Sequence, residues 1–134
     1  MAVHGSCLCG AVGWQADGPF ELMHHCHCSM CRKFHGSSFA TLVGAPLDDF
    51  RWLQGEDDIG SYASSAELTR PFCSRCGSPV PGDGGEGRTF MPAGCLDDDP
   101  GERPVAHIFA ASKAPWHEIS DDLPRFETRP PGVE

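Results

Sequence analysis

Short alternations of apolar and polar residues dominate the chain, and few stretches repeat with the spacing of a helix. Successive side chains of a strand point to opposite faces, so this alternation favours β-strands with one buried face. Turn signals such as Asp17-Gly18-Pro19 and Gly44-Ala45-Pro46 separate the runs. The pattern predicts short strands at residues 11–16, 21–26, 38–43, 49–53, 60–63, 68–72, 88–91 and 105–110.

These elements predict a mainly β fold, a small antiparallel β-sheet domain with one or two short helical turns, over residues 1–134. A helical turn is expected at residues 29–34, with Ser29 as its N-cap. A second short turn is expected after Pro46, and the glycine stretch 82–87 indicates a hairpin tip or a mobile loop. The sequence contains no internal repeat and no visible domain boundary.

The composition suggests that the chain needs help to hold its fold. Sixteen glycines and twelve prolines among 134 residues point to many turns and little long helix. A chain of this length builds one core of modest size. The eight cysteines are therefore the natural candidates for additional stabilisation, as metal ligands or disulfides.

The charge excludes some partners and indicates a compartment. The formal net charge is −9, and only ten residues are lysine or arginine. Basic side chains dominate nucleic-acid affinity, so we expect no nucleic-acid partner and, likewise, no anionic membrane surface. We find no signal peptide and no apolar run long enough to span a bilayer. We therefore expect a cytoplasmic protein whose thiols stay reduced and bind metal.

Four of the cysteines form two pairs with metal-ligand spacing. Cys7 and Cys9 belong to a C-x-C-G motif, in which an extended backbone points both sulfurs to one face. Cys73 and Cys76 belong to a C-x-x-C-G motif, in which a tight turn aims two thiolates inward. Two such pairs can form the closed tetrahedron of a structural zinc.

Three further cysteines stand within six residues, as Cys26, Cys28 and Cys31 in a C-x-C-x-x-C motif. Three protein ligands leave zinc one open position, which is typical of a catalytic site. An all-thiolate site suits a soft substrate ligand better than a hard oxygen, so it favours a thiol substrate.

The spacing alone leaves other arrangements open. Cys73 and Cys76 can instead pair with Cys26 and Cys28, and iron–sulfur ligation is another reading of the same residues. The remaining cysteine, Cys95, stands alone and is expected to be a small buried apolar residue.

The ordered clusters resemble the family of glutathione-dependent formaldehyde-activating enzymes, which includes centromere protein V-like proteins. The resemblance covers nearly the whole chain. It rests on Gly5-Ser6-Cys7-Leu8-Cys9-Gly10, Cys26-His27-Cys28-Ser29-Met30-Cys31-Arg32, Phe72-Cys73-Ser74-Arg75-Cys76-Gly77-Ser78-Pro79 and Ser112-Lys113-Ala114-Pro115-Trp116.

This resemblance implies a β-rich fold stapled by two Zn²⁺ ions per chain. It assigns Cys7, Cys9, Cys73 and Cys76 to a structural zinc, and Cys26, Cys28 and Cys31 to a catalytic zinc. The implied activity is carbon–sulfur lyase chemistry that interconverts S-hydroxymethylglutathione with glutathione and formaldehyde. The sequence lacks a strongly basic pocket for the carboxylates of glutathione, so the partner is a small thiol with glutathione as the leading candidate. Oligomeric state is not indicated.

The reaction requires an acid or base near the open zinc. Among His24, His25, His27 and His35, we prefer His35, because it follows the helical turn. In a strand, His27 faces away from the metal. Trp116 is expected to seal the core, with a place beside the zinc as its other reading. The competing function is a non-catalytic, zinc-stapled protein-binding module.

Overall fold

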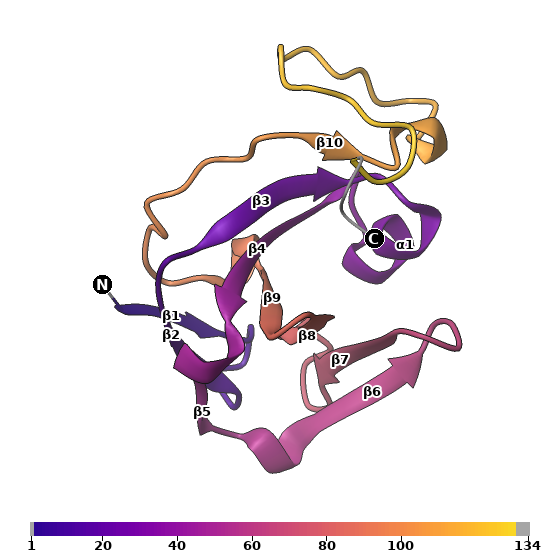
Figure 1. Cartoon of the computed structure of the whole chain (residues 1–134). Helices are drawn as coiled ribbons and strands as arrows, with labels where there is room; N and C mark the ends of the chain where they lie inside the picture. Colours follow the sequence, from indigo (N-terminus) through magenta and orange to yellow (C-terminus); the bar gives the residue numbers. More distant parts are fainter. Residues whose placement is uncertain (1, 131–134) are drawn as a thin grey trace.

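The computed structural model describes residues 2–130 and consists of small β-sheets with one short α-helix among these residues (Figure 1). The strands are β1 (Ala2–Ser6), β2 (Gly13–Asp17), β3 (Glu21–Cys26), β4 (Ala40–Pro46), β5 (Phe50–Gln54), β6 (Ile59–Ala63), β7 (Thr69–Cys73), β8 (Gly82–Gly85), β9 (Arg88–Pro92) and β10 (His107–Ile108). The helix α1 spans Ser29–His35, and short 3₁₀ turns occur at Leu47–Asp49, Glu56–Asp58, Ala93–Cys95 and Ala110–Ser112.

The strands form three sheets. The order is β1-β2-β5 in the first sheet and β10-β3-β4-β9-β8 in the central sheet, while β6 and β7 make a separate hairpin. All of these pairs are antiparallel except β10 with β3, which run parallel. The parallel pair brings a late segment of the chain beside the end of β3.

The main core lies between the first and the central sheets. Trp14 on β2 is fully buried and packs with Val43 on β4 and Met91 on β9, which are also fully buried. Val43 and Met91 are register partners in the central sheet. Gly5 on β1 lies against the ring of Trp14 so closely that a Cβ there would come within 2.3 Å of ring carbons. The apolar alternation read from the sequence therefore builds this core.

The predicted fold class, mainly β with antiparallel sheets and a short helix, is confirmed. The prediction missed β1 and extended the last strand, since β10 comprises only His107–Ile108. Part of the glycine stretch forms a strand, because β8 pairs with β9 through Gly82 and Asp83. A 3₁₀ turn follows Pro46, as expected.

Two local predictions are wrong. Ser29 does not cap α1: the N-cap is Cys28, whose Sγ accepts a hydrogen bond from the backbone N–H of Cys31. A sulfur thus takes the capping role expected of a hydroxyl. Trp116 does not seal the core, because 73 % of it is exposed. Its neighbour Ala114 is the fully buried residue of that turn.

Within residues 2–130, no helix is long and apolar enough to cross a membrane.

Candidate metal centres

Four cysteines that are distant in sequence meet in the structure. Cys7 and Cys9 follow β1, whereas Cys73 ends β7 and Cys76 lies in the turn after it. Their Sγ atoms all lie within 4.8 Å of one another, with 3.7 Å between Cys7 and Cys9 and 3.9 Å between Cys9 and Cys73. Four thiolates so arranged match the tetrahedral donor set of a structural zinc. We call these residues the four-cysteine cluster.

Tight turns aim these sulfurs at one point. Gly77 has φ of 81° and donates its N–H to the carbonyl of Cys73 at 2.7 Å. Gly10 has the same φ of 81° and donates to the carbonyl of Cys7 at 3.1 Å. Residues with a Cβ avoid this left-handed conformation, which explains the glycine that ends each motif. Hydrogen bonding with the side chain and then the backbone of Ser78 lowers the pKa of Cys76 to about 5, favouring the thiolate that a metal requires.

The three remaining clustered cysteines meet where β3 leads into α1. Cys26 ends β3, Cys28 caps α1 and Cys31 lies in its first turn. Their Sγ atoms lie within 4.8 Å of one another, and Cys26 and Cys31 are each only 4 % exposed. Hydrogen bonds from Cys26 and then Cys31 lower the pKa of Cys28 to about 2. We call these residues the three-cysteine cluster.

The donor sets of the two clusters differ in one respect that matters for chemistry. Among the described residues, no histidine, aspartate or glutamate joins the three-cysteine cluster as a further ligand. The alternative partition, which pairs Cys73 and Cys76 with Cys26 and Cys28, is not the arrangement of the structure. The chemistry of three thiolates fits a zinc ion that keeps a fourth position for another ligand.

Arg70 is a neighbour of the three-cysteine cluster that the sequence analysis did not find. Its Nη1 donates to Sγ of Cys31 at 3.3 Å, and its Nε donates to the hydroxyl of Ser64 at 3.1 Å. The guanidinium also lies 6.0 Å from the ring centre of Phe34 on α1. Burial opposes the charge of Arg70, but the bond to Cys31 and the thiolates outweigh it and raise the pKa of the guanidinium.

Arg70 therefore links the hairpin β6–β7 to α1, which face each other in Figure 1. The contact spans 39 positions of sequence and belongs to no short motif. The cysteine spacing gave no signal for it. A basic residue three positions before Cys73, in a chain with few basic residues, was the available hint.

His35, the preferred acid or base, lies at the end of α1 and is half-buried. Burial, followed by the charge of Arg70, lowers the pKa of His35, and the charge of Cys28 partly opposes this shift. The imidazole is therefore neutral near pH 7. It lines a cavity of about 250 Å³ together with Phe39, Ala40, Thr41, Cys95 and neighbouring residues. Cys95 is half-buried at this wall, and its thiol donates to the carbonyl of Pro79 at 3.6 Å.

The other candidate histidines are engaged elsewhere. The Nδ1 of His24 lies 2.6 Å from the carbonyl oxygen of Leu22, and that of His25 lies 2.8 Å from the hydroxyl of Thr41. His27 is fully buried, and burial lowers its pKa to about 4. The ammonium of Lys113 donates to the carbonyls of Ala114 and His117, which engages two of its three N–H donors.

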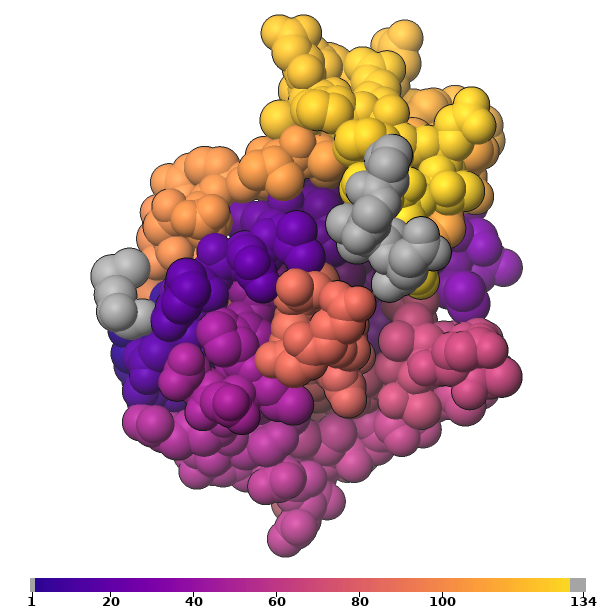
Figure 2. Space-filling model, viewed as in Figure 1, coloured from indigo at the N-terminus to yellow at the C-terminus, as the bar shows by residue number. Residues whose placement is uncertain are grey.

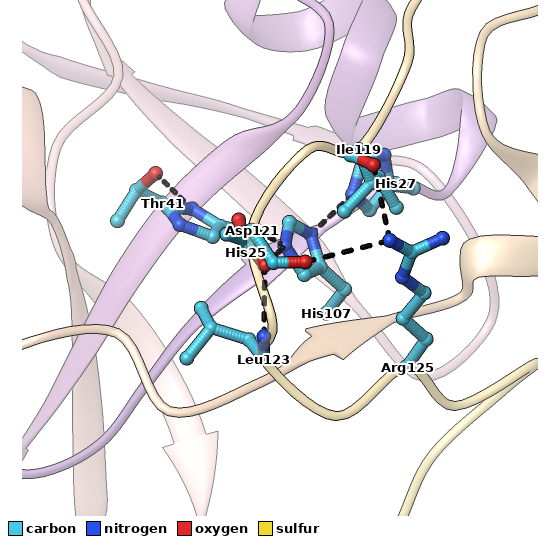
Figure 3. A network of polar contacts seen from close by, with 8 residues as sticks. All are labelled: His25, His27, Thr41, His107, Ile119, Asp121, Leu123 and Arg125. Atoms are coloured by element: carbon cyan, nitrogen blue, oxygen red, sulfur yellow. Dashed lines mark hydrogen bonds and ion pairs between the residues drawn. The ribbon is translucent and has the colours of Figure 1, made fainter.

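His27 belongs to a polar network on the side of β3 and β10 (Figure 3). Its Nε2 lies 2.8 Å from Nδ1 of His107, whose own Nε2 lies 2.9 Å from the carboxylate of Asp121. Figure 3 shows these contacts, which connect His27, just after β3, through His107 to Asp121 in the C-terminal segment. The bond from His107 lowers the pKa of Asp121, with a smaller contribution from the N–H of Leu123.

A small antiparallel β scaffold that carries two cysteine clusters, each able to hold a metal ion, defines the class of this protein. The chain belongs to the family of glutathione-dependent formaldehyde-activating enzymes, which it matches over residues 2–112. That match includes both cysteine clusters and Arg70, and it ends before Asp121.

Individual relatives agree with this family. A Halomonas elongata protein, named provisionally as a glutathione-dependent formaldehyde-activating enzyme, is 32 % identical over 137 residues, covering 89 % of this chain and 82 % of its own. An uncharacterised lyase of Schizosaccharomyces pombe is 30 % identical over 76 residues, covering 57 % of this chain and 53 % of its own. The crystal structure of a Rhodobacter sphaeroides protein is similar with a TM-score of 0.60 and 26 % identity, covering 75 % of this chain and 97 % of that one.

Proposed function

We propose that this protein is a zinc-dependent carbon–sulfur lyase that acts on a thiol–aldehyde adduct, with S-hydroxymethylglutathione as the leading candidate. The observation that carries the proposal is the three-cysteine cluster, to which no further protein ligand is added among the described residues. The family match and the names of the relatives support the reaction class. Free thiols persist in reducing compartments, so we place the protein in the cytoplasm.

The residues present fit two zinc ions with different roles. Cys7, Cys9, Cys73 and Cys76 would hold a structural ion, and Cys26, Cys28 and Cys31 would hold a catalytic one. When bound at the three-cysteine cluster, zinc supplies an open coordination position and stabilises a substrate sulfur as thiolate.

In the direction of cleavage, the hydroxyl of the adduct loses its proton, the carbon–sulfur bond breaks, and an aldehyde and a thiolate are formed. We assign the proton acceptor to His35, whose Nδ1 or Nε2 is unprotonated near pH 7 because its pKa is lowered. Arg70 offsets the negative charge that accumulates when a fourth thiolate joins the three-cysteine cluster. In the reverse direction, protonated His35 returns the proton to the alkoxide oxygen.

Substrate recognition relies on few cations. Arg32 donates to the carbonyl of His27, which engages one of its nitrogens. Lys33 is exposed on α1, and Arg70 lies beside Cys31. These side chains are the candidates to contact a carboxylate of glutathione, and a thiol with fewer carboxylates fits the acidic chain equally well.

Metal content and activity test the proposal together. We expect two zinc ions per wild-type chain and one in Cys28→Ser, which also loses cleavage of the glutathione–formaldehyde adduct, followed by release of formaldehyde. Cys95→Ser is the matched control for metal content, because Cys95 belongs to neither cluster. A single zinc in wild type, or unchanged turnover in Cys28→Ser, contradicts the proposal and favours the non-catalytic binding module.

His35→Gln tests the proton acceptor. General acid–base groups contribute about 10²- to 10⁴-fold to rate, so we expect kcat to fall by a factor in that range while the zinc content stays unchanged. Unchanged kcat in His35→Gln removes His35 from the mechanism and leaves the metal assignment intact.

A further inference from the structure

The C-terminal segment reaches His27, the residue between Cys26 and Cys28, through two buried imidazoles in series. Asp121 lies beyond residues 2–112, the part that matches the family, and its carboxylate contacts His107. The side chain of His107 is 2 % exposed, and His27 is fully buried. Figure 2 shows the C-terminal segment (yellow) packed on the preceding part of the chain (orange) at one end of the molecule.

The positions of the protons on the two imidazoles follow from the contact with the carboxylate of Asp121. A carboxylate only accepts hydrogen bonds, so Nε2 of His107 carries the proton. In a neutral His107 ring Nδ1 is then an acceptor, and the proton between the rings belongs to Nε2 of His27. Nδ1 of His27 has no partner among the described residues. A proton there would be an unpaired buried donor, so the arrangement favours neutral His27 with its proton on Nε2.

Asp121 is held in place despite the exposure of its side chain, which is 45 %. Its Oδ1 accepts from the N–H of Leu123 at 3.0 Å, and Arg125 donates to the carbonyl of Ile119 at 3.0 Å across the same loop. The backbone of His107 exchanges hydrogen bonds with Pro124 and Phe126, each at 2.9 Å. The loop that carries the carboxylate is therefore fastened directly to β10.

At its other end, this series of side chains meets the C-x-C arm, residues 26–28. His27 stands between Cys26 and Cys28, and its N–H donates to the carbonyl of Ile108 at 3.0 Å. A ring fixed on one side of an extended segment fixes the direction of the neighbouring side chains on the other side. The orientation of the two sulfurs thus depends on how firmly the imidazole of His27 is held.

We propose that Asp121 is a positioning residue for the three-cysteine cluster, acting through His107 and His27. It fixes one tautomer of each ring and so preorganises the arm for its metal. The inference rests on metal binding at this cluster, as stated in the proposed function, and is independent of the lyase reaction. Groups that orient ligands from outside the coordination shell typically change metal affinity by 10- to 100-fold.

The first test needs no metal. Nitrogen-15 spectra of the histidines in the metal-free full chain report the tautomer of each ring. We expect neutral, exchange-protected Nε2–H forms for His27 and His107, and mixed tautomers in Asp121→Ala. Asp122→Ala is the matched control, because Asp122 is the adjacent exposed carboxylate. An Nδ1–H form of His27 in wild type, or identical spectra in Asp121→Ala and wild type, overturns the proposal.

The second test measures zinc by competition with a chromogenic chelator, and cobalt spectra distinguish the two clusters. We expect Asp121→Ala to weaken zinc at the three-cysteine cluster about 10- to 100-fold, with the four-cysteine cluster and Asp122→Ala unchanged. Asp121→Glu, which restores the carboxylate, should recover part of the affinity. Equal weakening at both clusters, or none, overturns the proposal. If these results hold while the adduct is not cleaved, only the lyase assignment fails.

Discussion

Replacing Arg70 by Gln removes a cation from the edge of the three-cysteine cluster while keeping a polar side chain of similar length. The bond from Nη1 to Sγ of Cys31 is 3.3 Å long, and the sulfur carries charge when it binds metal. Hydrogen bonds to charged groups contribute roughly 1.5–3 kcal/mol, and the partial exposure of Arg70 places this one at the lower end. Since about 1.4 kcal/mol corresponds to a factor of ten, we expect zinc to bind this cluster about tenfold more weakly in Arg70→Gln.

The assay is chelator competition, with the two clusters resolved by cobalt spectra. Arg70→Lys keeps the charge but lacks the planar guanidinium. Its zinc affinity at the three-cysteine cluster should lie between those of wild type and Arg70→Gln. Arg75→Gln is the matched control, because Arg75 is exposed beside the four-cysteine cluster and forms its ion pair with Asp58. Equal zinc affinity of wild type and Arg70→Gln at the three-cysteine cluster refutes the electrostatic reasoning.

Two further changes test the core and the polar network. Gly5→Ala forces a Cβ to within 2.3 Å of the Trp14 ring, so we expect the free energy of unfolding to fall by about 1–3 kcal/mol, measured by urea denaturation. The bond from His107 holds the pKa of Asp121 below its ordinary value of 3.8, so the carboxylate stabilises the fold above pH 3.8 and loses this contribution as the pH falls through its folded pKa. The advantage of wild type over Asp121→Asn in unfolding free energy should therefore be constant near neutral pH and shrink under acid conditions.

Each of these changes has a control in the same chain. Gly94→Ala meets no atom within 4 Å and should leave the unfolding free energy within about 0.5 kcal/mol of wild type. A stable Gly5→Ala would show that the Trp14 ring moves aside. In the acid titration, the unfolding free energy of Asp122→Asn should change with pH as that of wild type does. An advantage of wild type over Asp121→Asn that grows on acidification contradicts the sign derived from the lowered pKa.

The sequence was sufficient for features that depend on local patterns. Strand β3 was predicted with its observed bounds, because residues 21–26 are bounded by turn signals and end at a cysteine motif. The cysteine motifs also indicated the kind of donor set at each centre. Spacing alone left open which cysteine pairs share a site, since the spacing within one pair does not determine which distant pair it contacts. The family resemblance suggested the grouping that the structure has.

Features that depend on tertiary contact could not be read from the sequence. Arg70 contacts Cys31 across 39 positions, and Asp121 contacts the imidazole of His107 on β10. Neither contact has a local sequence signature. Cys28 takes the place expected for Ser29 as the cap, because α1 begins at Ser29 and the Sγ of Cys28 accepts the N–H of Cys31. Trp116 looked like a core residue by its size, but the turn after the 3₁₀ segment points Ala114 inward instead.

The two clusters close loops of very different length. Cys9 and Cys73 of the four-cysteine cluster are 64 positions apart, whereas the three-cysteine cluster lies within six residues. A cross-link over the longer span removes roughly 4 kcal/mol of chain entropy from the unfolded state, against roughly 2 kcal/mol for the shorter one. With metal at the proposed sites, the short motif can bind its ion during folding while the chain is still open. The long one must wait until the amino-terminal strand and hairpin β6–β7 have met, so metal starvation would release that junction and leave a half-assembled chain.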